Sequence, residues 1–234
     1  MVEKVVAIIP AKNEEKNIGW VVEETKKYVD NIVVIDDGST DMTHIRAREK
    51  MGSSDHLITH PTNYGKGRSV ETAAIFLDSF FNLDDNDIVV MIDSDRQHLP
   101  SEIPRLLKKL RDENLDMVLA NRDVKSYPLF KRIGNKILSI MTSLAAGKWF
   151  KDSETGFRCI RYNKLVNLFK YINPKGFQLE AEMNVASGLF GYKIGFIDVG
   201  ATHYRHSQTI KSGFKNGWSI IKTWIKLKIK WLRW

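Results

Sequence analysis

The sequence predicts an α/β protein whose mostly parallel sheet is covered by helices on both faces. Three continuous runs rich in β-branched residues, at 5–9, 32–35 and 88–92, are typical of strands buried on both sides. Helical patterns separate these runs, and alternating strands and helices favour parallel pairing. The pattern weakens after about residue 122, so we expect a second half that completes the site of the first rather than a separate domain.

The remaining elements follow from periodicity and from capping residues. Weaker strands are expected at 56–59, 117–120, 156–160 and 194–199. Helices are expected over 14–28, 66–81 and 101–113. The last of these has Ser101 as its N-cap and Pro104 in its first turn.

Composition indicates an ordinary globular core. The chain has 234 residues, of which 43% are apolar and 27% charged, and this balance excludes a disordered protein. Its single cysteine excludes an intrachain disulfide, so a reducing compartment is expected. No signal peptide is recognised at the start, and no run approaches the roughly 20 apolar residues that span a bilayer. We expect a cytoplasmic protein, or one lying peripherally on the cytoplasmic face of a membrane.

The positive charge is confined to one end of the chain. The net charge is +8, and residues 205–234 carry eight basic side chains and no acidic one, which leaves residues 1–204 formally neutral. A nucleic-acid-binding domain more often spreads basic residues over its body. We therefore expect no nucleic acid partner.

Acidic residues follow the predicted strands where a ligand would bind. Ligands of open α/β sheets bind beyond the carboxyl ends of the strands, and Asp93 and Asp95 follow the strand at 88–92. Two carboxylates at this spacing suit Mg²⁺ or Mn²⁺, which also bridge diphosphate oxygens. An Asp-x-Asp pair is also common in a turn that caps a helix. Its position after a buried strand favours the metal site.

Two other loops are expected at the same edge. Asp36 and Asp37 follow the second strand, and two acids there need hydrogen-bond donors, which a nucleoside offers through its base and ribose. A strand-ending turn is the alternative. In the loop 63–67, glycines permit close backbone approach and Lys66 suits a phosphate, although a flexible turn explains the loop equally well.

Together these segments resemble the family 2 glycosyltransferases, and within them the polyprenyl- or dolichyl-phosphate sugar synthases. The matching pieces are 10–15, 36–41, 63–67, 93–98 and 152–158, with Arg205 and Lys211 beyond them. The resemblance implies a GT-A fold, which is Rossmann-like, and an inverting transfer. It departs at Lys12, where the family has tyrosine, at 120–122, and at 207–208, which leaves the sugar and the base open.

The resemblance also implies roles for individual residues. Contacts to the nucleotide sugar are implied for Pro10, Ala11, Lys12, Glu14, Asp37, Lys66, Asp93, Ser94, Asp95, Arg122, Arg205 and Lys211. The metal ligands would be Asp93, Asp95 and Gln97. The catalytic groups would be Asp95, Arg122, Arg132 and Arg205, with the arginines on phosphates of donor or acceptor. His203 is a possible further ligand, although a structural histidine is favoured.

The charge of the acceptor determines the predicted mechanism. A lipid phosphate is already anionic and needs cationic neighbours rather than a base, and the arginine fork matches phosphate oxygens. A hydroxyl acceptor would need a carboxylate base. Asp152 is the one candidate for that base, and a strand-flanking cap is its favoured role.

The C-terminal segment is predicted to lie on a membrane. We place a glycosyltransferase domain at 1–212 and a basic amphipathic helix with four tryptophans at 213–234, although 225–231 also alternates as a strand would. Tryptophan and lysine suit an anionic membrane surface. Segment 129–150 is a second candidate for membrane contact, and a buried domain helix explains it equally well.

The favoured function is metal-dependent transfer of mannose, glucose or N-acetylglucosamine from a GDP- or UDP-sugar to a polyprenyl phosphate. Glycan elongation on the same fold is the main alternative. A sugar-1-phosphate nucleotidyltransferase is more distant, because the segment 10–14 lacks its glycine- and arginine-rich loop. A basic-tailed adaptor would leave the acidic strand ends unexplained.

Overall fold

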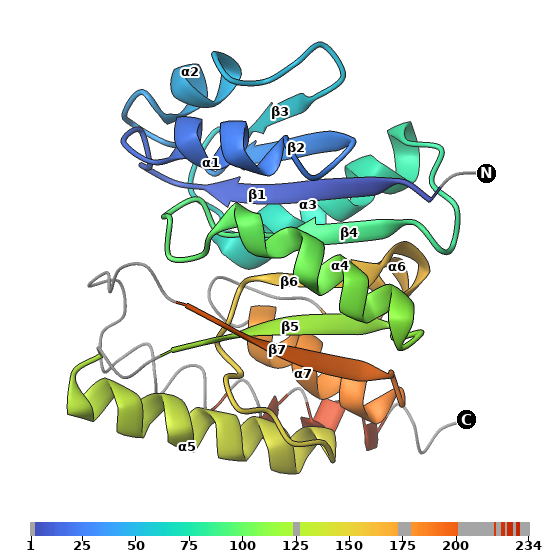
Figure 1. Cartoon of the computed structure of the whole chain (residues 1–234). Helices are drawn as coiled ribbons and strands as arrows, with labels where there is room; N and C mark the ends of the chain where they lie inside the picture. Colours follow the sequence, from blue (N-terminus) through green and yellow to red (C-terminus); the bar gives the residue numbers. More distant parts are fainter. Residues whose placement is uncertain are drawn as a thin grey trace.

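The computed structural model describes residues 3–123, 127–172 and 179–200, together with 218, 221, 222, 224–226, 228 and 229. Seven strands form one sheet in the order β3-β2-β1-β4-β6-β5-β7 (Figure 1). The predicted α/β class with a mostly parallel sheet is confirmed.

The first half of the sheet consists of four parallel strands. They are β1 (Val5–Ala11), β2 (Asn31–Asp36), β3 (His56–Thr59) and β4 (Ile88–Met91). In the register, Ile8 pairs with Val33 on one side and with Met91 on the other. The apolar runs in the sequence therefore become the buried central strands, as predicted.

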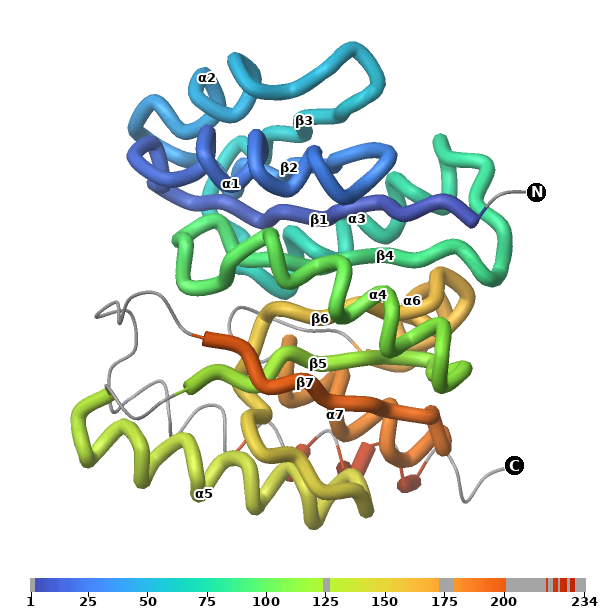
Figure 2. The backbone as a smooth tube through the Cα atoms, viewed as in Figure 1, coloured from blue at the N-terminus to red at the C-terminus, as the bar shows by residue number. Residues whose placement is uncertain are grey.

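The second half contains β5 (Met117–Arg122), β6 (Arg158–Arg161) and β7 (Ile194–Val199). β5 and β7 are parallel, whereas β6 is antiparallel to both β4 and β5 and joins the two halves (Figure 2). The strand predicted at 156–160 is therefore shifted and reversed. The other six strands still end at one edge, where the predicted site lies.

Helices cover both faces, as predicted. They are α1 (Ile18–Thr25), α2 (Thr43–Arg48), α3 (Lys66–Phe80), α4 (Ile103–Asp112), α5 (Leu129–Ala146), α6 (Tyr162–Phe169) and α7 (Leu179–Leu189). Alternate residues of β1 point to opposite sides, so Val6 and Ile8 pack with α3, α5, α6 and α7, whereas Ala7 and Ile9 pack with α1, α2 and α4.

Two predicted helix starts are wrong. Ser101 does not cap a helix, because 3-10 helix η1 (Pro100–Glu102) comes first and α4 begins at Ile103, with Pro104 in its first turn. The first helix begins at Ile18 rather than at residue 14, because Asn13 has a φ of 52° and the loop before Ile18 bonds to the loop after β2. Asn13 N–H donates to Ser39 Oγ and Glu14 N–H donates to Thr43 Oγ1.

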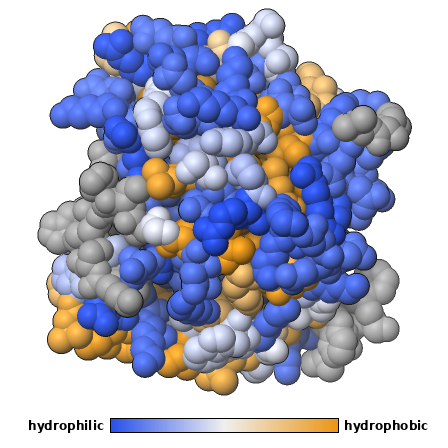
Figure 3. All heavy atoms as spheres, viewed as in Figure 1, coloured by the Kyte–Doolittle hydropathy of each residue, from blue (hydrophilic) through white to orange (hydrophobic). Residues whose placement is uncertain are grey.

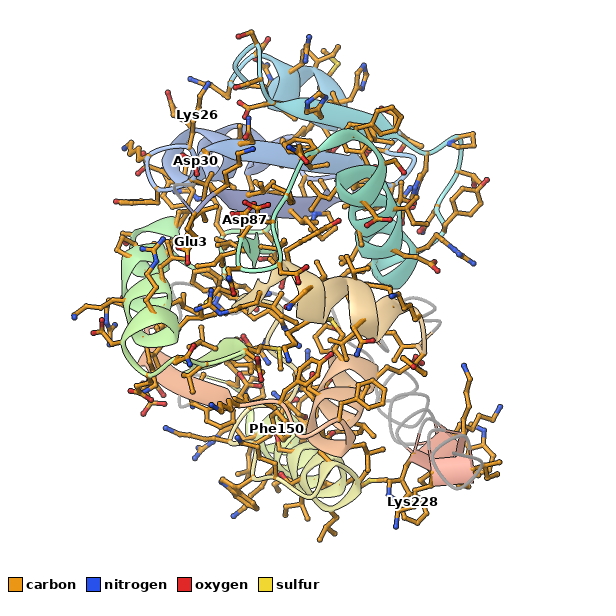
Figure 4. The ribbon with its side chains drawn as sticks, turned by 90° about the vertical axis from the view of Figure 1, so that its right-hand side faces the viewer. Glu3, Lys26, Asp30, Asp87, Phe150 and Lys228 are labelled. Atoms are coloured by element: carbon orange, nitrogen blue, oxygen red, sulfur yellow. The ribbon has the colours of Figure 1, made fainter. Side chains whose placement is uncertain are left out.

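The described residues between 218 and 229 have helical backbone, and the side chain of Trp224 packs against one of the two hydrophobic core clusters. Figures 1 and 4 place this segment, with Lys228, at the same end of the molecule as α5 and Phe150. Across the described ranges, no helix has the length and apolar character to cross a bilayer. The boundary at 212 stays a prediction.

Candidate active site

Loops after β1, β2 and β4 meet at one edge of the sheet. Ser94 Oγ donates to the carbonyl oxygen of Pro10 at 2.9 Å, which ties the loop after β4 to the end of β1. Lys12 Nζ donates to the carbonyl oxygen of Gly38 at 2.5 Å, which ties β1 to the loop after β2. The structure thus brings together the three clusters that the sequence singled out.

Asp37 is buried and organises the loop that leads into α3. Its carboxylate accepts the backbone N–H of Tyr64 at 2.9 Å and that of Gly65 at 2.7 Å, and it lies 2.9 Å from His60 Nδ1. The donors that this buried acid needs therefore come from the protein itself. Its nucleoside role stays a prediction, while its hydrogen bonds fix the backbone of the loop 63–67.

Lys66 begins α3 and joins two carboxylates. Its Nζ forms an ion pair with Asp93 and lies 2.5 Å from Oε1 of Glu180, the second residue of α7. Burial lowers the pKa of Lys66, but the charges of Asp93 and Glu180 outweigh burial and hold it above its ordinary value. The same ion pair holds the pKa of Asp93 below its ordinary value, against the effect of burial. Lys66 is therefore a fixed positive charge beside the predicted metal site.

Gly156 lies against this ion pair. A Cβ on Gly156 would lie 2.7 Å from Asp93 Cγ and 2.5 Å from Lys66 Nζ, distances that real Cβ atoms essentially never show. The segment before β6 thus packs its backbone directly on the pair, and a side chain at 156 would displace it.

Asp95 lies beside Asp93 and is held by Gln97. It accepts the backbone N–H of Gln97 at 3.0 Å and the side-chain Nε2 at 2.7 Å. Burial and the charge of Asp93 raise the pKa of Asp95. As placed, the Gln97 amide nitrogen faces Asp95, while its oxygen accepts from the Tyr127 hydroxyl at 3.4 Å, so Gln97 acts here as a support for Asp95. Its role as a metal ligand stays a prediction.

The donor set fits a hard divalent cation. Over the described residues there is no group of three or more His, Cys, Asp or Glu side chains that would form a complete protein cage. Mg²⁺ does not need one, because it is usually held by one or two carboxylates together with waters and substrate phosphates. A cation between Asp93 and Asp95 would also offset the repulsion that raises the pKa of Asp95.

His98 is buried under the same loop. Within the described ranges neither of its ring nitrogens has a hydrogen-bond partner, its ring lies 5.2 Å from that of Phe157, and burial lowers its pKa to about 4. A neutral imidazole at this position supports the loop by packing.

Arg122 and Asp152 form a closed pair at the end of β5. Arg122 Nε donates to Asp152 Oδ2 at 2.8 Å, and Nη2 donates to Oδ1 at 2.9 Å, in the bidentate geometry that suits guanidinium and carboxylate. Burial opposes ionisation of Asp152, but Arg122 holds the pKa of Asp152 below its ordinary value. A carboxylate held in this way is a weak proton acceptor.

Comparison with known proteins agrees with this geometry. Residues 6–171 match the model of the family described as glycosyl transferase family 2. The chain belongs to this family. An uncharacterized protein of Methanocaldococcus jannaschii is 40% identical over 67% of this chain and 71% of its own length.

Two further relatives of this family 2 glycosyltransferase have descriptive names. The UDP-N-acetylglucosamine–dolichyl-phosphate N-acetylglucosaminyltransferase of Methanococcus voltae is 27% identical over 95% of each chain. The undecaprenyl-phosphate 4-deoxy-4-formamido-L-arabinose transferase of Photorhabdus laumondii is 28% identical over 68% of this chain and 50% of its own. The chain therefore resembles transferases named for polyprenyl-phosphate acceptors.

Solved structures confirm the GT-A-like fold that the resemblance implied. Glucosyl-3-phosphoglycerate synthase of Mycobacterium tuberculosis, in a complex with UDP, superposes with a TM-score of 0.71 at 21% identity, over 96% of this chain and 79% of that one. Another structure of that enzyme contains Mn²⁺, UDP and phosphoglyceric acid. At this identity, the likeness shows the fold alone.

The remaining predicted site residues of this family 2 glycosyltransferase do not all lie at the candidate active site as described. Pro10 and Ala11 lie at the end of β1, and the Glu14 carboxylate accepts from Asn17 Nδ2 at 2.6 Å. Arg132 is exposed on the first turns of α5. Arg205, Lys211 and His203 lie outside the described residues, so their roles stay predictions.

Sequence reasoning assigned no role to two charged residues of this site, of which Arg158 lies in the matching segment 152–158. Glu180 pairs with Lys66, and Arg158 is fully buried, with Nη2 donating to the carbonyl oxygen of Thr155 at 2.6 Å and Nη1 to Asn184 Oδ1 at 3.1 Å. A signal for Glu180 was present, because it stands between Leu179 and Ala181 in a stretch that reads as buried. An acid in such a stretch needs a partner.

Proposed function

We propose that this family 2 glycosyltransferase transfers a hexose or N-acetylhexosamine from a GDP- or UDP-sugar to a polyprenyl phosphate, with inversion. The names of the Methanococcus voltae and Photorhabdus laumondii relatives support a polyprenyl-phosphate acceptor. The first of them matches this chain over 95% of its length, and its name favours a UDP-sugar.

The observation that carries the proposal is the bidentate ion pair between Asp152 and Arg122. Elongation of a glycan needs a carboxylate to accept the proton of a hydroxyl. Asp152 was the candidate, and its two oxygens accept from Arg122 Nε and Nη2 while its pKa is depressed. Glu180 is likewise held by Lys66. A phosphate acceptor needs no such base, because its oxygen is already anionic.

Asp93 and Asp95 would hold Mg²⁺ or Mn²⁺ against the diphosphate of the donor. When bound, the cation supplies neutralisation of the charge that develops on the departing nucleoside diphosphate. Lys66 Nζ, fixed beside Asp93, adds a second positive charge to the same region. Asp37 holds the loop 63–67 through the backbone N–H groups of Tyr64 and Gly65, and the loop would place Lys66 beside the phosphates.

Cationic groups would receive the acceptor. A guanidinium has five N–H donors, and among the described residues Arg122 gives two of them to Asp152, so that its other donors would be offered to a phosphate. Arg132, Arg205 and Lys211 would complete this set. They would lower the repulsion between acceptor phosphate and donor diphosphate and orient the attacking oxygen, which are electrostatic and positional effects. The enzyme would work at the cytoplasmic face of the membrane, with its basic C-terminal segment on anionic lipid.

The proposal is tested with radiolabelled sugar nucleotides. The protein is incubated with UDP-N-acetylglucosamine, UDP-glucose and GDP-mannose in turn, each with a polyprenyl phosphate and Mg²⁺, and the mixture is extracted with organic solvent. Label in the organic phase with one donor is the expected result. Label that appears only in an added water-soluble glycan would support elongation instead and overturn the proposal.

A further inference from the structure

One face of α5 is apolar and exposed. Side chains at helical spacing along it face solvent, among them Ile137 at 52% exposure and Leu144 at 78%. The other members of this outer face of α5 are Leu129, Phe130, Ile133 and Ile140, with Trp149 just beyond the helix. Figure 3 shows apolar atoms gathered along the edge of the molecule where Figure 1 places α5. Contiguous patches of this kind usually mark an interaction surface.

The exposure is not a sign of a misplaced core helix, because the opposite face of α5 is fully engaged. Leu138, Thr142 and Ala146 are buried on that side. Ala146 packs so closely on α7 that a Cβ on Gly188 would lie 2.6 Å from its own Cβ. The helix therefore has one buried face of small and apolar side chains against the core, and a second, apolar face that nothing in the described chain covers.

The charges around the outer face match an anionic surface. Residues 129–149 contain Lys131, Arg132, Lys136 and Lys148 and no acidic residue. Aromatic side chains stand at both ends of the stripe, Phe130 near its start and Trp149 after its end. Basic residues and amphipathic aromatics beside aliphatic ones are the composition of helices that lie in the plane of a lipid headgroup layer.

α5 also starts at the candidate active site. Tyr127 comes two residues before the helix, its hydroxyl donates to Gln97, and its ring lies 6.0 Å from the guanidinium carbon of Arg122. A surface that lies along α5 therefore ends beside the residues proposed to hold the metal and the phosphates. A lipid phosphate in that surface would reach the site without leaving the headgroup layer.

We propose that the outer face of α5 docks on an anionic lipid bilayer and so sets the open edge of the sheet at the lipid surface. This inference deepens the proposed function, since it names the surface through which a lipid-borne acceptor would be met. A second copy of the chain and a water-soluble protein partner are the other occupants that the experiment separates.

The test compares two double variants of the full-length chain. I137E/L144E places two acids on the outer face of α5, whereas I75E/F80E places two acids on α3 at side chains of similar exposure, 61% and 75%. Each protein is sedimented with vesicles of phosphatidylglycerol and phosphatidylcholine. We expect the α5 variant to lose about tenfold or more in vesicle affinity and the α3 variant to match the wild type. Circular dichroism spectra verify that each variant is folded.

A charge variant gives a second measurement. Lys136 is exposed, and the substitution Lys136→Glu leaves the apolar outer face of α5 intact. It should weaken vesicle binding about fivefold at low salt, and by less at high salt. Full vesicle affinity in both I137E/L144E and Lys136→Glu would overturn the inference. So would equal losses in the α3 and α5 double variants, or a wild-type dimer in solution that I137E/L144E converts to a monomer, which would make the face an interface between copies.

The result of the vesicle sedimentation does not depend on whether the proposed function is correct. Vesicle sedimentation needs no sugar transfer, so a failure to label any polyprenyl phosphate would remove the proposed acceptor without touching the docking face. Conversely, unchanged sedimentation of both I137E/L144E and Lys136→Glu, together with transfer to a short, water-soluble polyprenyl phosphate, would remove the docking face alone.

Discussion

Gly156 lies against the carboxylate of Asp93 at a distance that leaves no room for a side chain. An added Cβ would lie 2.7 Å from Asp93 Cγ, and Lys66 Nζ would be equally crowded. The segment before β6 and the loop after β4 are thus fitted to each other, and the position of the predicted metal ligand depends on a glycine more than 60 residues away in the chain.

Gly156→Ala should therefore impair transfer far more than its single methyl group suggests. Asp93 or Lys66 must move to admit the Cβ. A displacement of a metal ligand by about 1 Å can lower the rate about a hundredfold. Transfer rate and midpoint of thermal unfolding are measured together. Gly134→Ala is the matched control, since nothing lies within 4 Å of a Cβ built at Gly134 and alanine favours a helix. Wild-type rates in Gly156→Ala would show that the contact is unimportant.

Lys66→Met should destabilise the protein in the absence of metal. The substitution leaves the carboxylates of Asp93 and Glu180 without their shared cation, and removing one partner of a buried pair costs about 3–5 kcal/mol. Because a divalent cation on Asp93 would supply part of the lost charge, Mn²⁺ should raise the melting temperature of Lys66→Met by more than that of the wild type. Lys108→Met, at an exposed pair on α4, is the control and should change little. Equal Mn²⁺ effects on the wild type and Lys66→Met would argue against a cation at Asp93.

The strands and their common edge were predictable from the sequence, because apolar runs such as 5–9 and 88–92 can only be buried, and parallel strands end together. The reversed direction of β6 was not predictable, because the sequence of Arg158–Arg161 does not determine which strands it pairs with. The pairing partners of Asp93 and Asp152 were missed for the same reason. Lys66 reaches Asp93 and Arg122 reaches Asp152 from distant elements, and only the assembled fold decides which opposite charges meet.

Deletion of residues 213–234 should weaken binding to anionic vesicles. The segment holds basic residues and four tryptophans, and each basic residue near an anionic surface contributes about 1 kcal/mol. Sedimentation with vesicles at low and high salt measures the loss of vesicle affinity. This loss should be smaller at high salt, because salt screens the attraction between the basic residues of the wild type and the anionic lipid. Since Trp224 packs on the core, the truncated chain also needs a thermal unfolding measurement. Unchanged vesicle binding of a folded truncated chain would contradict a membrane role for this segment.

Asp152→Asn should destabilise the fold and change its response to acid. It leaves the Arg122 guanidinium buried without its charge partner, at a cost of about 3–5 kcal/mol near neutral pH. In the wild type, the pKa of Asp152 is lower in the folded state than its ordinary value of 3.8, so this stabilisation is complete above that pH and is lost as pH falls through the folded pKa. The difference in unfolding free energy between wild type and variant should therefore shrink below about pH 4. Urea titrations from neutral pH down to the acid range measure it, and a constant difference would contradict the ion pair.

Asp95→Ala should abolish transfer while the fold survives. In the protein without metal, the Asp95 carboxylate is disfavoured by burial and by the charge of Asp93, so removing it relieves repulsion and should leave the melting temperature unchanged or higher. With metal and donor present, the same change removes a predicted ligand, so Mn²⁺ should no longer raise the melting temperature as it does in the wild type. Thermal unfolding with and without Mn²⁺, together with the radiolabel assay, separates these effects. Full transfer by Asp95→Ala would remove the metal site from the mechanism, because the remaining carboxylate, Asp93, is already paired with Lys66.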